Sequence, residues 1–339
     1  MTLATVEKAA ALSVEKLTTE HPRDNLFRVL TLDGGGAKGF YTLGVLREIE
    51  GMLGCPLYKR FDLVFGTSTG AIIASLIALD FGVDAIHDLY KAHVPRVMQA
   101  RTPADKSAAL ANLSAAVFSE AKFDAVKTAI GIVATRWLLE TPMIFKGSIT
   151  QAHGRMGSFV PGFGCTIADA VQASCSAFPL FEMKTVTTAA GDAVDLIDGG
   201  YCANNPALYA IADAVVALKK DRKDVRVVSV GVGVYPEPQP RSFKMWFAKK
   251  YLLSVQLLQK TLEINTQSME QLRAILFKDI PTIRISDKFP QPEMATDFLE
   301  HDLKKLNILR QRGVESFAQR EALLKEFLLP RTEAANGHS

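Results

Sequence analysis

Three short motifs in the chain combine residue types that can cleave an acyl ester. Gly66-Thr67-Ser68-Thr69-Gly70 has the pattern G-x-S-x-G and lies between an apolar run at 61–65 and a nearly all-apolar helical run. A serine on a sharp strand-to-helix turn is pushed out of the sheet, and small flanking residues relieve the crowding. The positive end of the following helix favours the negative charge that develops during acyl transfer. We therefore expect Ser68 to be a nucleophile held by Gly66 and Gly70, against the alternative of a serine that only caps the helix.

The second motif is glycine-rich and follows the first predicted strand. After Asp33 it contains Gly34, Gly35, Gly36, Ala37, Lys38 and Gly39. Consecutive glycines allow several backbone N–H groups to point into one space, as an oxyanion hole requires. The same residues fit the dinucleotide fingerprint G-x-G-x-x-G, but that fingerprint needs an acidic residue at the end of the next strand, where this chain has the serine turn. Residues 34–39 are therefore predicted to form the oxyanion hole.

The third motif, Asp198-Gly199-Gly200, follows a predicted strand at 193–197. Asp-Gly is also a common turn, and alone it favours a turn. Beside a nucleophile and an oxyanion loop, Asp198 becomes the candidate base. Outside the C-terminal tail only His301 follows it, in a charged segment expected at the surface, so we favour a Ser68–Asp198 dyad over a triad. An unperturbed aspartate is a poor base at neutral pH, so the dyad requires a desolvated Asp198 hydrogen-bonded to Ser68.

Composition places the chain among ordinary globular proteins. Of 339 residues, 48% are hydrophobic and 22% charged, and the formal charge of +3 is too small to indicate a nucleic-acid binder. Four widely spaced cysteines without zinc spacing predict reduced, buried thiols, and we expect no metal and no cofactor. Neither a secretory signal nor an uncharged run of about 18 apolar residues is present, which predicts a cytoplasmic protein whose membrane contact is peripheral.

The order of apolar runs predicts an α/β fold. Strand-like runs at 28–32, 61–65, 193–197 and 225–233 alternate with helical segments, as in a mainly parallel sheet covered on both faces. We expect an N-terminal extension at 1–27, a catalytic domain at 28–235, and a helical C-terminal part at 236–339 packed on the same domain. An Ala-rich stretch predicts a helical insertion at about 104–164, either a mobile lid or a packed helical layer.

A basic and aromatic stretch opens the C-terminal part. Residues 241–253 read RSFKMWFAKKYLL, in which cations alternate with aromatic side chains. Such a mixture suits the headgroup level of an anionic bilayer, and it also suits an amphipathic helix packed on the core. Both interpretations remain open at this point.

At these motifs the sequence resembles the patatin-like phospholipases. The resemblance rests on DGGGAKG at 33–39, GTSTG at 66–70 and DGG at 198–200 in the same order, with ASCSAFP at 173–179 as a fourth block. It implies a three-layer α/β/α sandwich and hydrolysis of phospholipid acyl esters without a metal. It also implies that Ser68 and Asp198 act as a dyad without histidine and that Gly34–Gly39 form the oxyanion hole.

The segment 257–272 resembles a narrower group, the bacterial patatin-like effectors of antiphage defence that cyclic oligonucleotides switch on. This resemblance implies a nucleotide activator bound away from the dyad. The expected partner is a phospholipid membrane surface, which the active enzyme meets at the inner membrane. Whether the protein forms a homo-oligomer is left open by the sequence. The alternatives are a serine thioesterase or peptidase, and a non-catalytic nucleotide sensor that uses 34–39 as a phosphate cradle.

Overall fold

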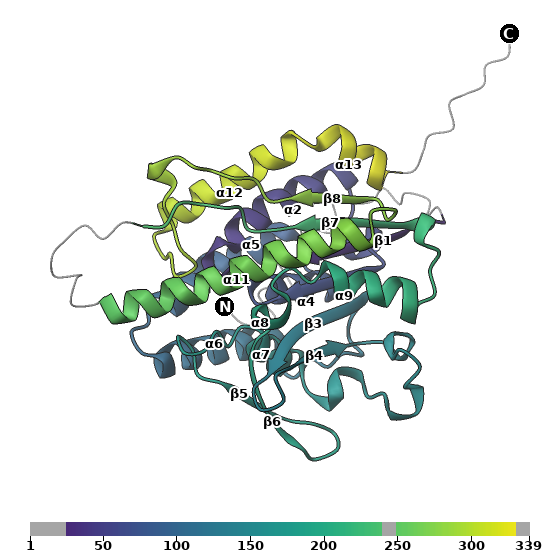
Figure 1. Ribbon diagram of the computed structural model, residues 1–339, viewed down its shortest axis with the longest axis horizontal. Coiled ribbons are helices and arrows are strands. Elements are labelled where there is room, and N and C mark those ends of the chain that lie inside the picture. Colours follow the sequence, from purple (N-terminus) through teal and green to yellow (C-terminus); the bar gives the residue numbers. More distant parts are fainter. Residues whose placement is uncertain (1–24, 239–248, 330–339) are drawn as a thin grey trace, which may run out of the picture.

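An eight-stranded sheet crosses the protein in the order β5-β6-β3-β2-β1-β7-β8, and β4 pairs with β3 (Figure 1). The computed structural model describes residues 25–238 and 249–329. The strands are β1 (Phe27–Leu32), β2 (Leu63–Thr67), β3 (Ala129–Arg136), β4 (Thr141–Lys146), β5 (Lys184–Thr187), β6 (Ala193–Asp198), β7 (Val225–Val230) and β8 (Thr282–Ile285). Only β4 and β6 run against the other strands, which confirms the mainly parallel α/β sheet.

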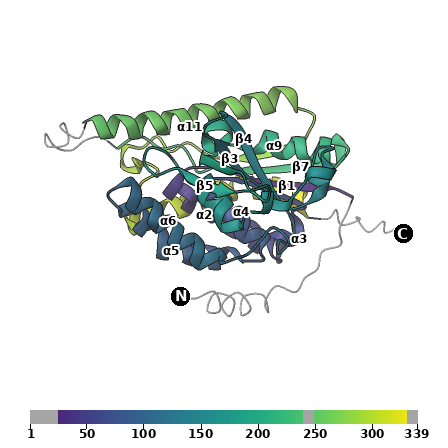
Figure 2. The ribbon, with the colours of Figure 1, turned by 90° about the horizontal axis from the view of Figure 1, so that it is seen from below.

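Helices cover both faces of the sheet, so the fold has three layers (Figure 2). Their bounds are α2 (Gly39–Leu53), α3 (Leu57–Arg60), α4 (Thr69–Ala78), α5 (Val83–Gln99), α6 (Pro103–Phe118), α7 (Ile167–Ser174), α8 (Gly200–Ala203), α9 (Ala207–Ala212), α11 (Lys249–Leu276), α12 (Leu303–Ala318) and α13 (Glu321–Leu328). Alternate strand residues enter different apolar clusters, as the two-residue period of a strand requires. Leu30 and Leu32 pack with α2, α4 and α5, whereas Val29 packs with α8 and α9.

Two strands meet end to end along one edge of β3. The first half of β3 pairs with β2, up to Thr67 opposite Val133, and the second half pairs with β6, from Asp198 opposite Ala134. Because β4 pairs with β3 over the whole stretch 131–136, β2 and β6 must share the other edge. They run in opposite directions, so their carboxyl ends face each other there. The register alone therefore places Ser68 next to Asp198.

The expected helical insertion at 104–164 is wrong. Only its first part is a long helix, α6, whereas 129–136 and 141–146 are the strands β3 and β4 of the sheet. The Ala-rich part of the stretch is the helix α6, whereas residues 130–133 read Ile-Gly-Ile-Val, and β-branched residues favour a buried strand. The glycine-rich stretch 154–164 contains short 3₁₀ turns, η3 (Met156–Ser158) and η4 (Pro161–Gly164).

The C-terminal part is not purely helical, because β8 extends the sheet beside β7. Among its helices, α12 packs closely on α2, where a Cβ on Gly44 would lie 2.1 Å from the Arg310 carbonyl oxygen. The longest helix of the part predicted to be helical is α11, at 249–276. Residues 239–248, most of the basic and aromatic stretch, lie outside the described residues. Within the described part of the chain, no helix has the length and hydropathy needed to cross a bilayer.

Candidate active site

Ser68 lies on a strained turn between β2 and α4. Its backbone has φ 53° and ψ −123°, an unusual conformation for a residue with a side chain. Its carbonyl oxygen accepts hydrogen bonds from the N–H groups of Ala71 (2.8 Å) and Ile72 (3.2 Å), the first bonds of the helix. Ser68 is partly exposed while its neighbours are buried, so the turn presents the hydroxyl outward, as expected for a nucleophile.

The flanking glycines are needed because backbones approach closely around this turn. A Cβ on Gly66 would lie 2.3 Å from the carbonyl oxygen of Gly70, and a Cβ on Gly70 would lie 2.2 Å from that of Leu32. In both cases the obstacle is backbone, which cannot move aside as a flexible side chain can. The predicted role of Gly66 and Gly70 thus has a steric basis.

We expect Gly70→Ala to lower the free energy of unfolding by about 2 kcal/mol or more, because overpacking against backbone is costly. A matched control is Gly51→Ala on the exposed face of α2, where nothing lies within 4 Å of the added Cβ. That change should raise stability by roughly 0.5–1 kcal/mol, since alanine is the better helix former. Urea denaturation of both variants measures the contrast, and equal stabilities would refute the close-approach argument.

Asp198 faces Ser68 from the end of β6. Its carboxylate accepts a hydrogen bond of 2.7 Å from the N–H of Gly200. The side chain is 1% exposed. Burial raises the pKa of this carboxyl to about 7, although its interactions with the Gly200 N–H and the Ser68 hydroxyl oppose the shift. Asp198 is thus desolvated beside Ser68, and its raised pKa gives it the basicity that a base at neutral pH requires.

Ser174 ties the two reacting turns together. Its hydroxyl accepts a hydrogen bond from the N–H of Ser68 (2.9 Å) and donates one to the carbonyl of Val133 (2.6 Å). Its carbonyl accepts the N–H of Gly199, 3.2 Å away. The sequence alone predicts no role for Ser174. Its only distinguishing feature there is its place in the block ASCSAFP at 173–179, about 20 residues before Asp198.

Cys175 is the other nucleophilic atom beside Ser68. The thiol is buried, and this burial raises its pKa well above the ordinary value although the interaction with the Ser68 hydroxyl opposes the shift. It therefore stays neutral and does not compete as a nucleophile. All four cysteines are free thiols, as the sequence predicted, with Cys202 less buried than the others.

The glycine-rich loop offers fewer free amides than predicted. The N–H groups of Gly34, Ala37, Lys38 and Gly39 already donate to carbonyl oxygens of the protein, those of Gly34 and Ala37 to Asn204 (3.0 Å) and Phe298 (2.9 Å). The prediction that all of residues 34–39 form the oxyanion hole is therefore wrong for these four residues. Gly35 and Gly36 border the same cavity as Ser68, and within the described residues no backbone acceptor is recorded for their N–H groups.

Thr69 is a further amide that the sequence prediction passed over. As the first residue of α4 its N–H has no partner one turn earlier, and Thr69 is among the residues that border the same cavity. The residue after the nucleophile supplies such a donor in other serine hydrolases with this turn. His301, the alternative base, is exposed in the segment before α12 and outside the group of residues that line this cavity.

A narrow apolar cavity opens beside the Ser68 hydroxyl. It encloses about 60 Å³, room for only a few water molecules. Its apolar wall comes mainly from α4, α5, α6, the 175–181 segment and α11. The side chains that form this wall are Ile72, Val94, Val97, Met98, Leu110, Leu113, Ala177, Phe181, Leu262 and Phe298. Such a lining fits the hydrocarbon of an acyl chain.

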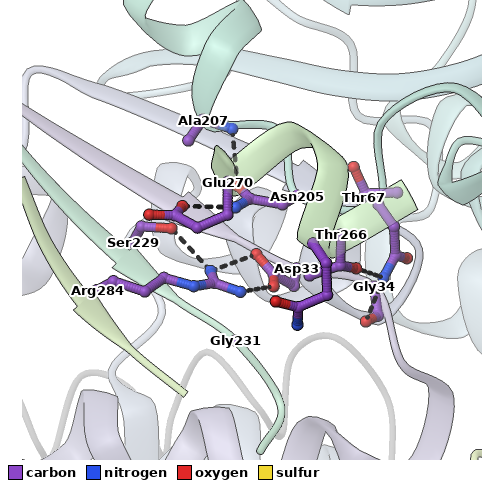
Figure 3. A network of polar contacts seen from close by, with 12 residues as sticks. Asp33, Gly34, Thr67, Asn205, Ala207, Ser229, Gly231, Thr266, Glu270 and Arg284 are labelled. Atoms are coloured by element: carbon purple, nitrogen blue, oxygen red, sulfur yellow. Dashed lines mark hydrogen bonds and ion pairs between the residues drawn. The ribbon is translucent and has the colours of Figure 1, made fainter. Parts of the chain in front are cut away.

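Helix α11 holds the loops that carry the reacting groups (Figure 3). The Asn204 side chain donates to the Gly34 carbonyl (3.3 Å) and to Thr266 of α11 (2.7 Å). One residue on, Asn205 donates to Glu270 of the same helix (3.2 Å). A movement of α11 would therefore act on the glycine-rich loop and on the turn after Asp198 together.

The base of the glycine-rich loop is fixed by an ion pair from the other side (Figure 3). Arg284 of β8 donates to both carboxylate oxygens of Asp33, the Nη1 bond being 2.8 Å, and also to the Ser229 hydroxyl at 2.8 Å. All three side chains are buried or largely so. A bidentate guanidinium–carboxylate pair sets orientation as well as position, so β8 helps to aim the loop that follows Asp33.

Comparisons with known proteins find similar sequences among phospholipases. Residues 30–211 match the family model described as patatin-like phospholipase. The chain is 70% identical over 319 residues to a cUMP-AMP-activated phospholipase of Escherichia coli, covering 94% of this chain and 99% of that protein. It is 25% identical to a cGAMP-activated phospholipase of Vibrio cholerae over 90% of this chain and 96% of that protein. A cGAMP-activated phospholipase of Pseudomonas aeruginosa is 28% identical over 60% of this chain and 62% of that protein.

Proposed function

As the chain belongs to the patatin-like phospholipase family, we propose that Ser68 and Asp198 cleave acyl esters of membrane phospholipids through an acyl-enzyme. Asp198 takes the proton of the Ser68 hydroxyl as its oxygen attacks the ester carbonyl carbon. The N–H groups of Gly35 and Gly36 stabilise the resulting oxyanion, with that of Thr69 as a third donor. Collapse expels the lysophospholipid alkoxide, which takes the proton from Asp198. Water, activated by Asp198 in turn, then hydrolyses the acyl-enzyme and releases the fatty acid.

The observation that carries this proposal is the strand register that sets Ser68 beside the buried carboxylate of Asp198, whose pKa is raised to about 7. Such a carboxylate is ionised in a substantial fraction at neutral pH and is far more basic than an exposed aspartate. The apolar cavity favours an acyl chain over the peptide backbone that a peptidase would hold. A phosphate cradle at 34–39 is not supported, because four of its six amides are already bonded to carbonyls.

We propose further that a cyclic dinucleotide activates the enzyme, with cUMP-AMP as the first candidate because of the relative from Escherichia coli. Two observations support a switched enzyme. The cavity beside Ser68 is narrow, about 60 Å³, and Leu262 of α11 forms part of its wall, so a movement of α11 would change the space open to an acyl chain. The side chains Thr266 and Glu270 connect α11 to both catalytic loops, which gives a distant ligand a route to the site. In this proposal the active enzyme acts at the cytoplasmic face of the inner membrane, in antiphage defence. The experiment below also measures whether the protein self-associates.

The test combines purified protein, phosphatidylethanolamine–phosphatidylglycerol vesicles and cUMP-AMP. We expect cUMP-AMP to increase fatty-acid release by about tenfold or more and to raise the melting temperature, because a ligand that binds only the folded state stabilises it. cGAMP and the linear dinucleotide UpA are the matched controls, and light scattering records any change in molecular mass. Unchanged hydrolysis and an unchanged melting temperature with both cyclic dinucleotides would contradict the regulatory proposal.

A further inference from the structure

The turn between β3 and β4 exposes three consecutive large apolar side chains. Trp137 is 46% exposed, Leu138 86% and Leu139 61%. Folding normally hides such residues, and contiguous exposed apolar surface marks an interaction site. Neither the fold nor the dyad accounts for them, because they lie beyond the paired part of the β3–β4 hairpin.

This turn projects from the sheet edge that carries the reacting groups. Ala134 of β3 pairs with Asp198, and the chain leaves the sheet only two residues later. The Trp137 N–H donates to the Asp195 carbonyl (2.9 Å), so the pairing with β6 continues to the turn. The Trp137 ring lies 5.5 Å from the Phe178 ring, and Phe178 directly follows Ala177 of the cavity wall. The exposed turn and the cavity are therefore neighbours.

The apolar surface continues beyond the turn itself. Leu139 and Val160 line one open hollow of about 390 Å³, together with Met143 and Phe163. Val160 is 43% exposed. We name Trp137, Leu138, Leu139 and Val160 the hairpin patch. It joins two segments that are distant in sequence into one apolar surface beside the catalytic edge.

We propose that the hairpin patch inserts into the interfacial layer of a phospholipid bilayer and seats the active site on it. This inference rests on the proposed function, because a phospholipid substrate lies in a bilayer and the catalytic edge must face it. An indole combines an apolar body with one polar N–H, which suits the headgroup level, and the two leucines reach the acyl region below. Arg136 at the base of the turn adds a cation that suits lipid phosphates.

Tryptophan fluorescence tests the insertion directly, because the chain has two tryptophans, Trp137 and Trp246. A Trp246→Phe variant reports on the hairpin patch alone, and a Trp137→Phe variant reports on the basic and aromatic stretch. Both carry Ser68→Ala so that the phosphatidylethanolamine–phosphatidylglycerol vesicles stay intact, and cUMP-AMP is present. We expect a blue shift of Trp137 emission and its quenching by brominated acyl chains. Vesicle binding without quenching of Trp137 overturns the proposal, and quenching of Trp246 alone assigns insertion to 241–253.

Activity measurements separate docking from chemistry. Leu138→Ser/Leu139→Ser should lower hydrolysis of vesicle phospholipid about tenfold or more, because two exposed leucines no longer partition into the bilayer. The rate on a soluble short-chain ester should stay unchanged. The control Ile275→Ser/Leu276→Ser removes two exposed apolar side chains, 61% and 58% exposed, from the end of α11 that precedes β8, at the opposite sheet edge. It should change neither rate.

Each result has a separate meaning. Equal vesicle hydrolysis by the wild type and by Leu138→Ser/Leu139→Ser overturns the docking role. A variant that still binds vesicles but has a lower molecular mass than the wild type by light scattering also overturns it, and assigns the patch to self-association. If the wild type cleaves neither substrate with cUMP-AMP present, the proposed function fails, while the fluorescence of Trp137 still decides whether the patch inserts.

Discussion

Replacing Ser68 with alanine should reduce fatty-acid release by about 10⁴-fold or more, since the variant has no atom that can form the acyl-enzyme. The fold should survive, because the hydrogen bonds that hold the turn use the backbone N–H and carbonyl of residue 68. The measurements are product release from defined phospholipid and covalent labelling by a fluorophosphonate, which should modify the wild type at Ser68 and leave the variant unlabelled.

Ser75→Ala is the matched control for this substitution. Ser75 lies in the same helix, is fully buried, and its hydroxyl has no hydrogen-bond partner within the described residues. Its removal should leave the rate and the labelling unchanged. Labelling that persists in Ser68→Ala, or activity near the wild-type level, would remove Ser68 from the mechanism.

Asp198→Asn should lower the rate about 10³-fold or more, because the amide cannot accept the serine proton. In the wild type, kcat should rise with pH through about 7 and then level off, as the Asp198 carboxyl loses its proton. A flat profile across pH 5.5–8.5 would contradict Asp198 as the base. Asp195→Asn on the exposed face of the same strand, where Asp195 accepts a 2.6 Å hydrogen bond from Thr185, should keep both the rate and the profile.

The same substitution should stabilise the folded protein at alkaline pH. Between the ordinary value of 3.8 and about 7, the folded state keeps a proton on Asp198 that the unfolded chain has released. Wild-type stability therefore falls as the pH rises through this window and stays low above it. Asp198→Asn avoids that loss, so its free energy of unfolding should exceed the wild type's at pH 8, by about 4 kcal/mol at most, and approach it near pH 4. Denaturant titrations at both pH values measure the difference.

The motifs predicted from sequence are those that a few adjacent residues define. The turn at Ser68 needs a strand, a helix and two small neighbours, all visible within about fifteen residues, and its positive φ follows from them. The oxyanion hole was predicted too broadly because the partners that occupy the amides of Gly34 and Ala37 come from Asn204 and Phe298, far along the chain. No local pattern records such a pairing.

The prediction of a helical insertion at 104–164 was wrong for a different reason. It extended the helix of the Ala-rich residues 104–118 into 129–136, where the β-branched residues Ile130, Ile132 and Val133 favour the strand that β2, β4 and β6 complete. The role of Ser174 likewise depends on hydrogen bonds to backbone N–H groups that are distant in sequence, those of Ser68 and Gly199. Sequence reasoning thus predicted the candidate nucleophile and base, which the structure places side by side, whereas the residues that hold them in position could be identified only from the assembled sheet.

The shared edge of β3 has a consequence for how the enzyme can change shape. Since β2 and β6 are anchored to consecutive residues of one strand, any sliding or bending of β3 carries the proposed nucleophile and base as a single unit. Part of the wall of the apolar cavity belongs to α5 and α6, which carry neither Ser68 nor Asp198. Movement of α5 and α6 can therefore widen the space for a lipid chain while the two proposed reacting groups keep their mutual spacing, which separates admission of the substrate from the geometry of the chemical step.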